Sequence, residues 1–385
     1  MDPDIITHNV PVQIREVSGK KLLREFIFLP EKIHKDHTGW VPPIYSFEFN
    51  YFTPEKNRAF LYSDTTLLLA YTDGKIAGRI MGIINRRINE HKSEKTARFG
   101  FLECWDDQSV AHALLSYIEQ WAGEKGMTKI VGPMGFNNQD PAGFMIQGFE
   151  YNPTFSTYYN FDYINRLLIN EGYSKEIDYV VYKIDIQADL PEFYSKLYER
   201  IITRYDYKDI VLKKRSQIKP YIIPILELMN ECFEDLYGFQ PLDNIEMKNL
   251  AKRFIPVLDP RFVKVITKNN RVIGFNIAMP NLSDGIRKAK GRLFPFGIFH
   301  MLRAAKTARQ LDSLIGGISK EHRGRGIDVM MGHTTMTAAQ KAGFRFADSH
   351  HELENNTKVR AEMERLGGEV YKRYRIYRKE LQAQI

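Results

Sequence analysis

The sequence has few cysteines and no long apolar segment. Its two cysteines, Cys104 and Cys232, lie far apart in the 385 residues and have no metal-ligand spacing. A disulfide framework is therefore not expected, and a reducing cytoplasm is the simplest location for the chain. No uninterrupted apolar run is long enough to cross a bilayer. The first residues, Met1 to Ile6, lack the basic start and apolar centre of a signal peptide.

Low-complexity tracts are also missing, and the remaining composition is that of a globular protein rich in Phe and Tyr. The length of 385 residues predicts two domains rather than one. The net charge of +8 permits attraction to phosphorylated cofactors, nucleic acid or anionic lipid. Because no nucleic-acid-binding signature is recognisable, nucleic acid is not expected as a partner.

The most informative segment reads Arg-Gly-Arg-Gly-Ile-Asp, from Arg323 to Asp328. An apolar run precedes it, and a run compatible with a helix, Val329 to Ala342, follows it. In a strand, turn and helix of this kind, Gly324 and Gly326 permit positive φ and let backbone N–H groups close on a phosphate. Arg323 and Arg325 would add positive charge. Taken alone, the segment fits a solvated strand-to-helix turn equally well.

The segments after this turn make the pattern more specific. They predict a strand at Phe344 to Ser349, a helix from Asn356 to Leu366 and a strand at Val370 to Tyr377. This order resembles the second half of the GNAT acyltransferase fold, in which the glycine turn holds the pyrophosphate of an acyl coenzyme A. The resemblance implies acetyl-CoA or another acyl-CoA as cofactor and no metal. The residues it assigns to the cofactor are Gly317, Ile318, Arg323, Gly324, Arg325, Gly326, Ile327 and Asn356.

Within this resemblance, two parallel strands separate and the pantetheine inserts between them. The strands would be Leu314 to Ile318 and Phe344 to Ser349, with a backbone N–H near Gly317 or Ile318 facing the thioester oxygen. The pair Gly316-Gly317 fits a β-bulge at this place.

Two positions depart from the family pattern. Asp328 replaces the final Gly or Ala of the pyrophosphate motif, where a carboxylate would either cap the helix or repel a phosphate. Met363 stands where many members have a Tyr that protonates the departing thiolate. That role would pass to Tyr371, to Tyr374 or to water.

The first half of the chain follows a similar order. A hairpin with an Asp73-Gly74 turn precedes a strand at Arg98 to Cys104, a helix at Ser109 to Glu124 and a strand at Met127 to Val131. A second hairpin, with Asn269-Asn270 at its turn, precedes the glycine turn described above. We therefore predict an α/β protein with two GNAT-like domains, each a mixed sheet flanked by helices.

The predicted domains are residues 1–185 and 186–385, joined near Asp185 to Pro191. Through Trp40-Val-Pro-Pro43, Gly78-Arg79 and Gly132-Pro133, the first half also resembles a bacterial group labelled as N-acetyltransferases of unassigned substrate. Only the second domain is expected to bind coenzyme A. In the first, Asp106 and Asp107 precede the corresponding helix, and their carboxylates would cap its free N–H groups and repel a phosphate.

For the general base, Glu352 is the first candidate, with His350 and His351 behind it. All three come just after the second separating strand, at the strand end where α/β sites gather. The adjacent histidines cannot both point one way, because side chains alternate along a strand. Glu352 is also compatible with a surface carboxylate or a helix cap.

The loop from Gly132 to Gly148 is rich in glycine and amides. It predicts either an acceptor pocket or an Ω-loop whose amides satisfy their own backbone. The two interpretations are equally supported. The side chains that would bind the acceptor are Asn137, Asn138, Gln139 and Asp140.

A basic and aromatic segment, Arg287 to Arg309, interrupts the path from hairpin to strand. A helix that covers the core is the favoured interpretation, ahead of a lid over the substrate. Contact with a membrane surface is the least favoured, because the segment has no clean amphipathic period.

Together these features predict an acyl-CoA-dependent N-acyltransferase acting on an unidentified small-molecule or peptide amine. Two alternatives remain. Asp328 and Met363 are compatible with a non-catalytic acyl-CoA-binding or interaction protein. The positive charge also permits a Fem-like transfer of aminoacyl groups from tRNA, although the chain has no sustained heptad for the coiled-coil arm usual there.

Overall fold

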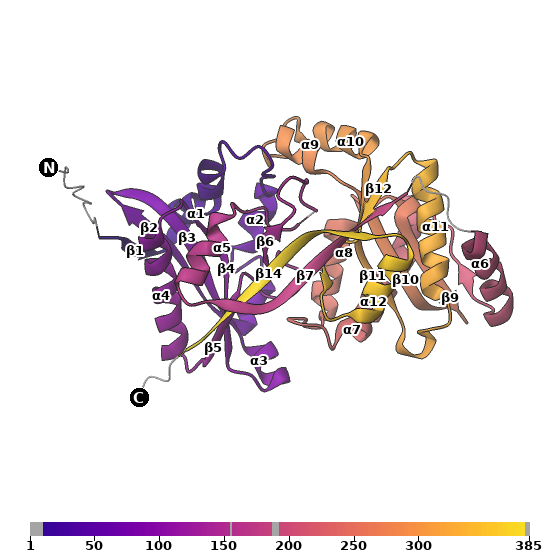
Figure 1. Ribbon diagram of the computed structural model, residues 1–385, viewed down its shortest axis with the longest axis horizontal. Helices are drawn as coiled ribbons and strands as arrows, with labels where there is room; N and C mark the ends of the chain where they lie inside the picture. The colour runs from indigo at the N-terminus through magenta and orange to yellow at the C-terminus, as the bar shows by residue number, and fades with distance from the viewer. Residues whose placement is uncertain (1–10, 155, 187–191, 382–385) are drawn as a thin grey trace. The chain divides into compact units, whose positions relative to one another are not determined.

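The computed structural model describes residues 11–154, 156–186 and 192–381 (Figure 1). The first ten residues, and residues 187–191 of the predicted junction, lie outside the described part. Two compact units are present. Unit 1 takes its residues from Met1–Ile146, Tyr158–Ile177 and Tyr374–Ile385, and unit 2 from Gln147–Thr157 and Asp178–Arg373.

Unit 1 contains a mixed sheet in the order β1-β2-β3-β4-β5-β14, where β14 is the last strand of the chain, Glu369–Glu380. All neighbours in it are antiparallel except β4 and β5, which run parallel from Thr96↔Lys129 to Arg98↔Val131. Its elements are β1 Gln13–Glu16, α1 Gly19–Ile33, α2 Tyr45–Tyr51, the 3-10 helix η1 Arg58–Tyr62, β2 Ser63–Thr72, β3 Lys75–Asn85, α3 Arg86–Lys92, β4 Thr96–Cys104, α4 Gln108–Glu124, β5 Lys129–Gly132, β6 Phe144–Gln147 and α5 Tyr163–Asn170.

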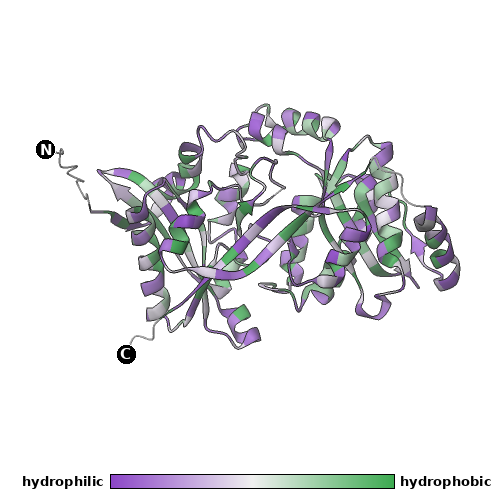
Figure 2. Cartoon of the chain, in the orientation of Figure 1, coloured by the Kyte–Doolittle hydropathy of each residue, from purple (hydrophilic) through white to green (hydrophobic). Residues whose placement is uncertain are grey.

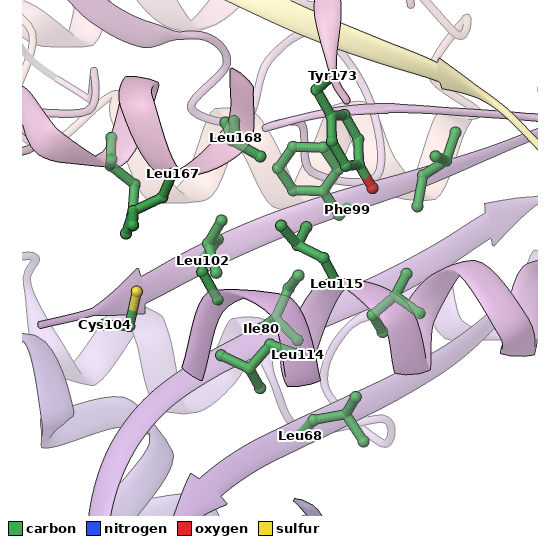
Figure 3. Close-up of a cluster of buried hydrophobic side chains, with 14 of the residues drawn as sticks. Leu68, Ile80, Phe99, Leu102, Cys104, Leu114, Leu115, Leu167, Leu168 and Tyr173 are labelled. Carbon is green, nitrogen blue, oxygen red and sulfur yellow. The ribbon is translucent and has the colours of Figure 1, made fainter. Parts of the chain in front are cut away.

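Helices cover both faces of this sheet. Leu68 and Ile80 pack with α4 and α5 in one buried cluster, part of which is shown in Figure 3. Their neighbours in sequence, Leu69 and Met81, pack with α1 and α2 in another. Because successive side chains of a strand point to opposite faces, a continuous apolar run indicates a strand buried on both sides.

Unit 2 repeats the plan with a sheet in the order β7-β12-β11-β10-β9-β8, in which β11 and β12 are the parallel pair. Its elements are β7 Ser174–Asp185, α6 Glu192–Tyr205, β8 Lys208–Asp209, η2 Arg215–Ile218, α7 Lys219–Phe233, α8 Asn244–Phe254, η3 Pro260–Phe262, β9 Val263–Lys268, β10 Arg271–Pro280, α9 Ser283–Lys288, α10 Gly297–Thr307, β11 Gln310–Ile318, η4 Lys320–His322, α11 Ile327–Lys341, β12 Phe346–Asp348, β13 Glu352–Leu353, α12 Thr357–Arg365 and β14 Glu369–Glu380.

The hairpins of both units close with left-handed turns. Asp73 and Gly74 have φ values of 51° and 70°, and Asn269 and Asn270 have values of 49° and 62°. Asn, Asp and Gly tolerate this conformation, which matches the twist of a two-residue hairpin. Both hairpins predicted from the sequence are therefore confirmed.

Two long strands each contribute residues to both units. β7 follows α5 of unit 1, and its end pairs with β12 of unit 2, from Asp185↔Phe346 to Lys183↔Asp348. β14 follows α12 of unit 2, and its end pairs with β5 of unit 1, from Tyr377↔Gly132 to Glu380↔Lys129. Each repeat thus gives the end of its last strand to the sheet of the other repeat.

The predicted fold class is confirmed, because each unit is a mixed sheet flanked by helices. The division at residues 185 and 186 stays a prediction about folding domains, whereas the compact units are discontinuous in sequence. Among the described residues, no helix is long and apolar enough to cross a membrane.

Candidate functional site in unit 2

The parallel strands of unit 2 separate after a single short stretch of pairing. Their last paired residues are Asp312 of β11 and Asp348 of β12. Beyond this point, β11 continues to Ile318 with β10 as its strand partner among the described strands. Beyond Asp312, the edge of β11 that faced β12 is therefore available to a ligand, as the GNAT resemblance implies.

The β-bulge of β11 is not at the position predicted from the sequence. The register shifts between Ile315 and Ser313, whereas Gly316 and Gly317 pair regularly with Asn276 and Phe275. Close packing explains Gly317 instead, since a Cβ there would lie 2.9 Å from the Phe275 ring and 3.1 Å from the Cys232 sulfur.

The glycine turn leads directly into α11. Gly324 and Gly326 have φ values of 71° and 85°, and Gly326 is the N-cap residue of the helix. No side chain caps this helix end, so its first N–H groups are not satisfied by a side chain of the turn. An anion placed here would meet these donors and the positive end of the helix dipole.

The corresponding helix of unit 1 is closed by its own chain. Asp107 is the N-cap of α4, and its carboxylate accepts hydrogen bonds from the N–H groups of Ser109 (2.9 Å) and Val110 (3.4 Å). The predicted capping by Asp107 is confirmed. The two units therefore differ at the element that holds a pyrophosphate in the resembling family.

Positive charge surrounds the turn of unit 2. Arg323 and Arg325 are exposed, and the Arg323 guanidinium donates to the carbonyl of Ile318 at the end of β11 (3.2 Å). The pKa of His322 is lowered, first by burial and then by Arg325 and Lys268. The charges of Arg325 and Lys268, which add to the effect of burial on His322, would also attract phosphate.

Three carboxyl groups, beginning with Asp328 at this helix end, interact electrostatically in sequence: Asp328 with Glu362, and Glu362 with Glu352. Asp328, in the first turn of α11, helps burial to raise the pKa of Glu362 on α12 to about 7. Burial, and then Glu362, raise the pKa of Glu352 on β13 to about 8. A carboxyl group with so high a pKa is a strong enough base to take a proton from an ammonium at mildly alkaline pH.

The predicted histidines have different surroundings. His350 has a left-handed backbone (φ 62°), and its N–H donates to Asp348 (2.8 Å). The His351 ring stacks on Tyr179 at 4.9 Å between centroids, and burial holds its pKa well below the usual range. Burial thus keeps His351 neutral and makes it a weak base, whereas burial raises the pKa of Glu352 into the range of a general base.

Tyr371 and Asn356 are engaged within the protein. The Tyr371 hydroxyl donates to Asp348 at 2.5 Å in a buried position, which disfavours it as a proton donor to a thiolate. Asn356 is the N-cap of α12 and accepts from the N–H of Val359. Met363 packs against an apolar cluster of unit 2 and has no hydroxyl with which to protonate a thiolate. The catalytic and cofactor-binding roles remain predictions.

Sequence reasoning missed a buried charge network at the point where β11 and β12 separate. The Lys372 ammonium, fully buried on β14, donates to Asp348 (2.7 Å), to Thr154 (2.8 Å) and to the carbonyl of Asn152 (3.1 Å). Burial favours the neutral form of Asp348, but Lys372 and the hydrogen bonds around it hold the pKa of that carboxyl below its usual range.

Asp312 completes this network as the carboxyl group whose pKa is raised. Burial, and then the charge of Asp348, raise the pKa of Asp312 to about 7. Its oxygens accept from the side-chain amides of Asn281 and Gln310, each at 2.8 Å. Removing one partner of such a buried ion pair typically costs about 3–5 kcal/mol. The network therefore fixes the geometry at the apex of the separating strands.

The amide-rich loop of unit 1 satisfies part of its own backbone. Asp140 accepts hydrogen bonds from the Tyr51 hydroxyl (2.9 Å) and from the N–H of Phe136 (2.8 Å), and Asn137 accepts from the N–H of Gln139 (2.8 Å). These contacts favour the Ω-loop interpretation for Asp140 and Asn137. The buried Asn138 Oδ1 and Gln139 Nε2 have no hydrogen-bond partner among the described residues, so they remain candidates for binding an acceptor.

Unit 1 also contains a part-buried chain of polar contacts that the sequence did not predict. The His34 Nε2 lies 3.0 Å from the Glu103 carboxylate, and its Nδ1 lies 2.9 Å from Nδ1 of His37. Trp40, from the Trp-Val-Pro-Pro segment, stacks on His34 at 4.9 Å. Burial, and then His34, lower the pKa of His37 to about 4, so the His37 ring stays neutral near pH 7.

Among the described residues, no group of three or more His, Cys, Asp or Glu side chains is placed to hold a metal ion.

Known proteins resemble the chain over nearly its full length. No family model matches it. It is 27% identical over 382 residues to the bacterial ceramide synthase of Caulobacter vibrioides (strain NA1000 / CB15N), covering 97% of this chain and 98% of that protein. It is 25% identical over 376 residues to protein YghO of Escherichia coli (strain K12), covering 96% and 95%.

Solved structures show the same fold at low identity. A tandem GNAT protein from the clavulanic acid biosynthesis pathway has a TM-score of 0.55 and 11% identity, covering 96% of this chain and 99% of that one. A GCN5-related N-acetyltransferase from Sphaerobacter thermophilus has a TM-score of 0.51 and 13% identity, covering 97% of each chain. The chain therefore has the tandem GNAT fold, as the sequence predicted.

Proposed function

We propose that this protein is an N-acyltransferase that moves the acyl group of an acyl coenzyme A to the primary amine of a long-chain amino alcohol. The observation that carries the proposal is the strand separation after Asp312 and Asp348, followed by the uncapped start of α11 beside Arg323 and Arg325. This arrangement suits a thioester between the strands and a pyrophosphate at the helix.

The acceptor class is supported by the likeness to the bacterial ceramide synthase over almost all of both chains. A ceramide is the amide of a fatty acid with a long-chain amino alcohol, so such an enzyme forms a C–N bond at a primary amine. By the same likeness, the acyl group is a long one rather than acetyl.

The reaction removes two protons from the ammonium nitrogen and expels one leaving group, the thiolate of coenzyme A. The ammonium loses a proton to a base, and the free amine attacks the thioester carbonyl. The C–S bond then breaks, the nitrogen loses its second proton as the amide forms, and that proton passes to the departing thiolate, so that coenzyme A leaves as its thiol. Glu352 is the proposed base because its pKa of about 8 lies close to that of an amine acceptor. The N–H groups of β11 beyond Asp312 would stabilise the oxyanion.

The test is thiol release from palmitoyl-CoA or acetyl-CoA in the presence of sphinganine, with identification of the amide by mass spectrometry. We expect release that depends on the free amine and is faster with the palmitoyl donor. N-acetylsphinganine, which lacks that amine, is the control. Coenzyme A binding without turnover on any amine would favour a non-catalytic acyl-CoA-binding protein, and no binding at all would refute the cofactor site.

A further inference from the structure

The segment between β10 and β11 exposes large apolar side chains in a concentrated group. Five of them, Phe294, Phe296, Ile298, Phe299 and Leu302, are 78%, 67%, 40%, 67% and 51% exposed. They fall within nine consecutive residues at the start of α10. Scattered exposed apolar residues are normal, but a contiguous group of this kind marks an interaction surface.

A surface helix usually turns its large apolar residues toward the core, and α10 does the opposite. The residues it buries are the small ones, Gly297 and Ala304. Ala304 faces α9, where a Cβ on Gly285 would lie 2.8 Å from both Ala304 Cβ and the carbonyl of His300, and a Cβ on Gly297 would meet the carbonyl of Arg292 between the two helices. At helical spacing, Ile298, Phe299 and Leu302 fall on the side away from these buried residues. The close helix contact therefore leaves the large side chains outside.

Positive charge surrounds these apolar side chains. Between Ser283 and Arg309 the sequence has seven Lys and Arg residues and one acid, Asp284. Asp284 is already paired with Arg287 at 2.8 Å. Lys288, Lys290, Arg292, Arg303, Lys306 and Arg309 are exposed. Figure 2 shows α9 and α10 carrying hydrophilic and hydrophobic residues along both helices.

We propose that this α9–α10 surface, formed by the five apolar and six basic side chains named above, docks unit 2 onto an anionic lipid bilayer. Aromatic rings enter the region between headgroups and acyl chains, and clustered Lys and Arg attract anionic headgroups. The sequence shows no amphipathic period here because the apolar side chains come partly from a loop, Leu293 to Phe296, and partly from the helix. The surface would dock whether or not the transferase activity proceeds.

The test uses the full chain and vesicles that contain neither acyl-CoA nor amine substrate. We expect co-flotation with vesicles of equal phosphatidylglycerol and phosphatidylcholine, and weak binding to phosphatidylcholine alone. Binding should fall when the salt concentration rises from 0.1 to about 0.5 M, because screening shortens the reach of the charges.

A triple variant, Phe294→Ser, Phe296→Ser and Phe299→Ser, should bind phosphatidylglycerol vesicles at least about tenfold more weakly. Its melting temperature should be unchanged, because the three rings are exposed. The matched control is Leu61→Ser, Ile169→Ser and Val211→Ser, which removes three side chains of 67%, 56% and 71% exposure elsewhere. The control should bind vesicles like the wild type.

Three outcomes would overturn the proposal. The first is no vesicle binding by the wild-type chain, and the second is equal binding by the Phe variant and the wild type. The third is a wild-type dimer, seen by analytical ultracentrifugation, that the Phe variant converts to monomer, since the surface would then join two copies of the chain. Because no substrate is present, failure here is distinct from failure of the proposed transferase activity.

Discussion

Glu352 has the property that a general base for an ammonium needs, a carboxyl pKa raised to about 8 by burial and by Glu362. Replacing it with Gln should lower kcat by about 10²–10⁴-fold and leave acyl-CoA affinity nearly unchanged. In the wild type, kcat should rise with pH up to about 8, as the carboxylate forms. The variant should lack this rise.

Glu362→Gln is the matched control, because it removes the neighbouring charge that helps to raise the Glu352 pKa. It should move the rise in kcat to lower pH without abolishing turnover. The folded chain binds the Glu352 proton more tightly than the unfolded chain does, so this group lowers stability as pH increases from about 4.5 to about 8. Full turnover by Glu352→Gln would assign the base to His350, to His351 or to water.

At the scale of elements, local turn chemistry explains what the sequence could predict. Asp73-Gly74 and Asn269-Asn270 specify left-handed turns without help from distant residues. Asp107 likewise sits three residues or fewer from the N–H groups it caps. In contrast, Gly316-Gly317 did not mark the bulge of β11, which lies between Ser313 and Ile315. Gly317 is needed for close packing against Phe275 and Cys232, which come from other elements and could not be read from the local sequence.

The candidate site was predictable to the same extent. The glycine turn and Glu352 follow from local order along the chain. The network of Asp312, Asp348 and Lys372 does not, because its members pair only when three strands and residues 152–154 meet. A lysine within a strand that also carries Arg373 and Arg375 gives no sign that it is fully buried.

The glycine turn should bind coenzyme A through charge and backbone donors. Arg325→Gln removes an exposed charge without a clash, and should weaken coenzyme A binding at least about tenfold, or about 1.4 kcal/mol, in calorimetry. Lys248→Gln, which removes an exposed charge on α8, should have no effect. Gly326 is a poor test position, because its φ of 85° strains any other residue and a Cβ there would also lie 2.3 Å from Ile201 of α6, so the variant would lose stability.

Binding should saturate at one coenzyme A per chain, because Asp107 occupies the helix end of unit 1 that a second pyrophosphate would need. Two equivalents per chain would show a second site that the Asp107 cap does not close, and affinity unchanged in Arg325→Gln would place the cofactor away from the glycine turn.

At the scale of the whole molecule, the exchanged strand ends tie the two repeats together. The end of β14 brings Tyr377, which is 1% exposed, into the main apolar cluster of unit 1. Its hydroxyl donates to Asn165 at 2.9 Å. In return, Val180, Tyr182 and Ile184 of β7 belong to an apolar cluster of unit 2. The core of each unit is therefore completed by a strand end that comes from the other half of the sequence.

Residues 1–185 expressed alone should fail to fold, since β5 would have an open edge and the core would lose Tyr377, and residues 186–385 should fail for the equivalent reason. Deleting a buried aromatic side chain alone typically costs about 3–5 kcal/mol, which is a large share of the stability of a domain. Co-expression should restore a soluble complex of the two fragments with a single cooperative melt. A cooperative melt of either fragment alone, near the temperature of the intact chain, would show that the exchanged strands are dispensable and that the two sequence halves are independent domains.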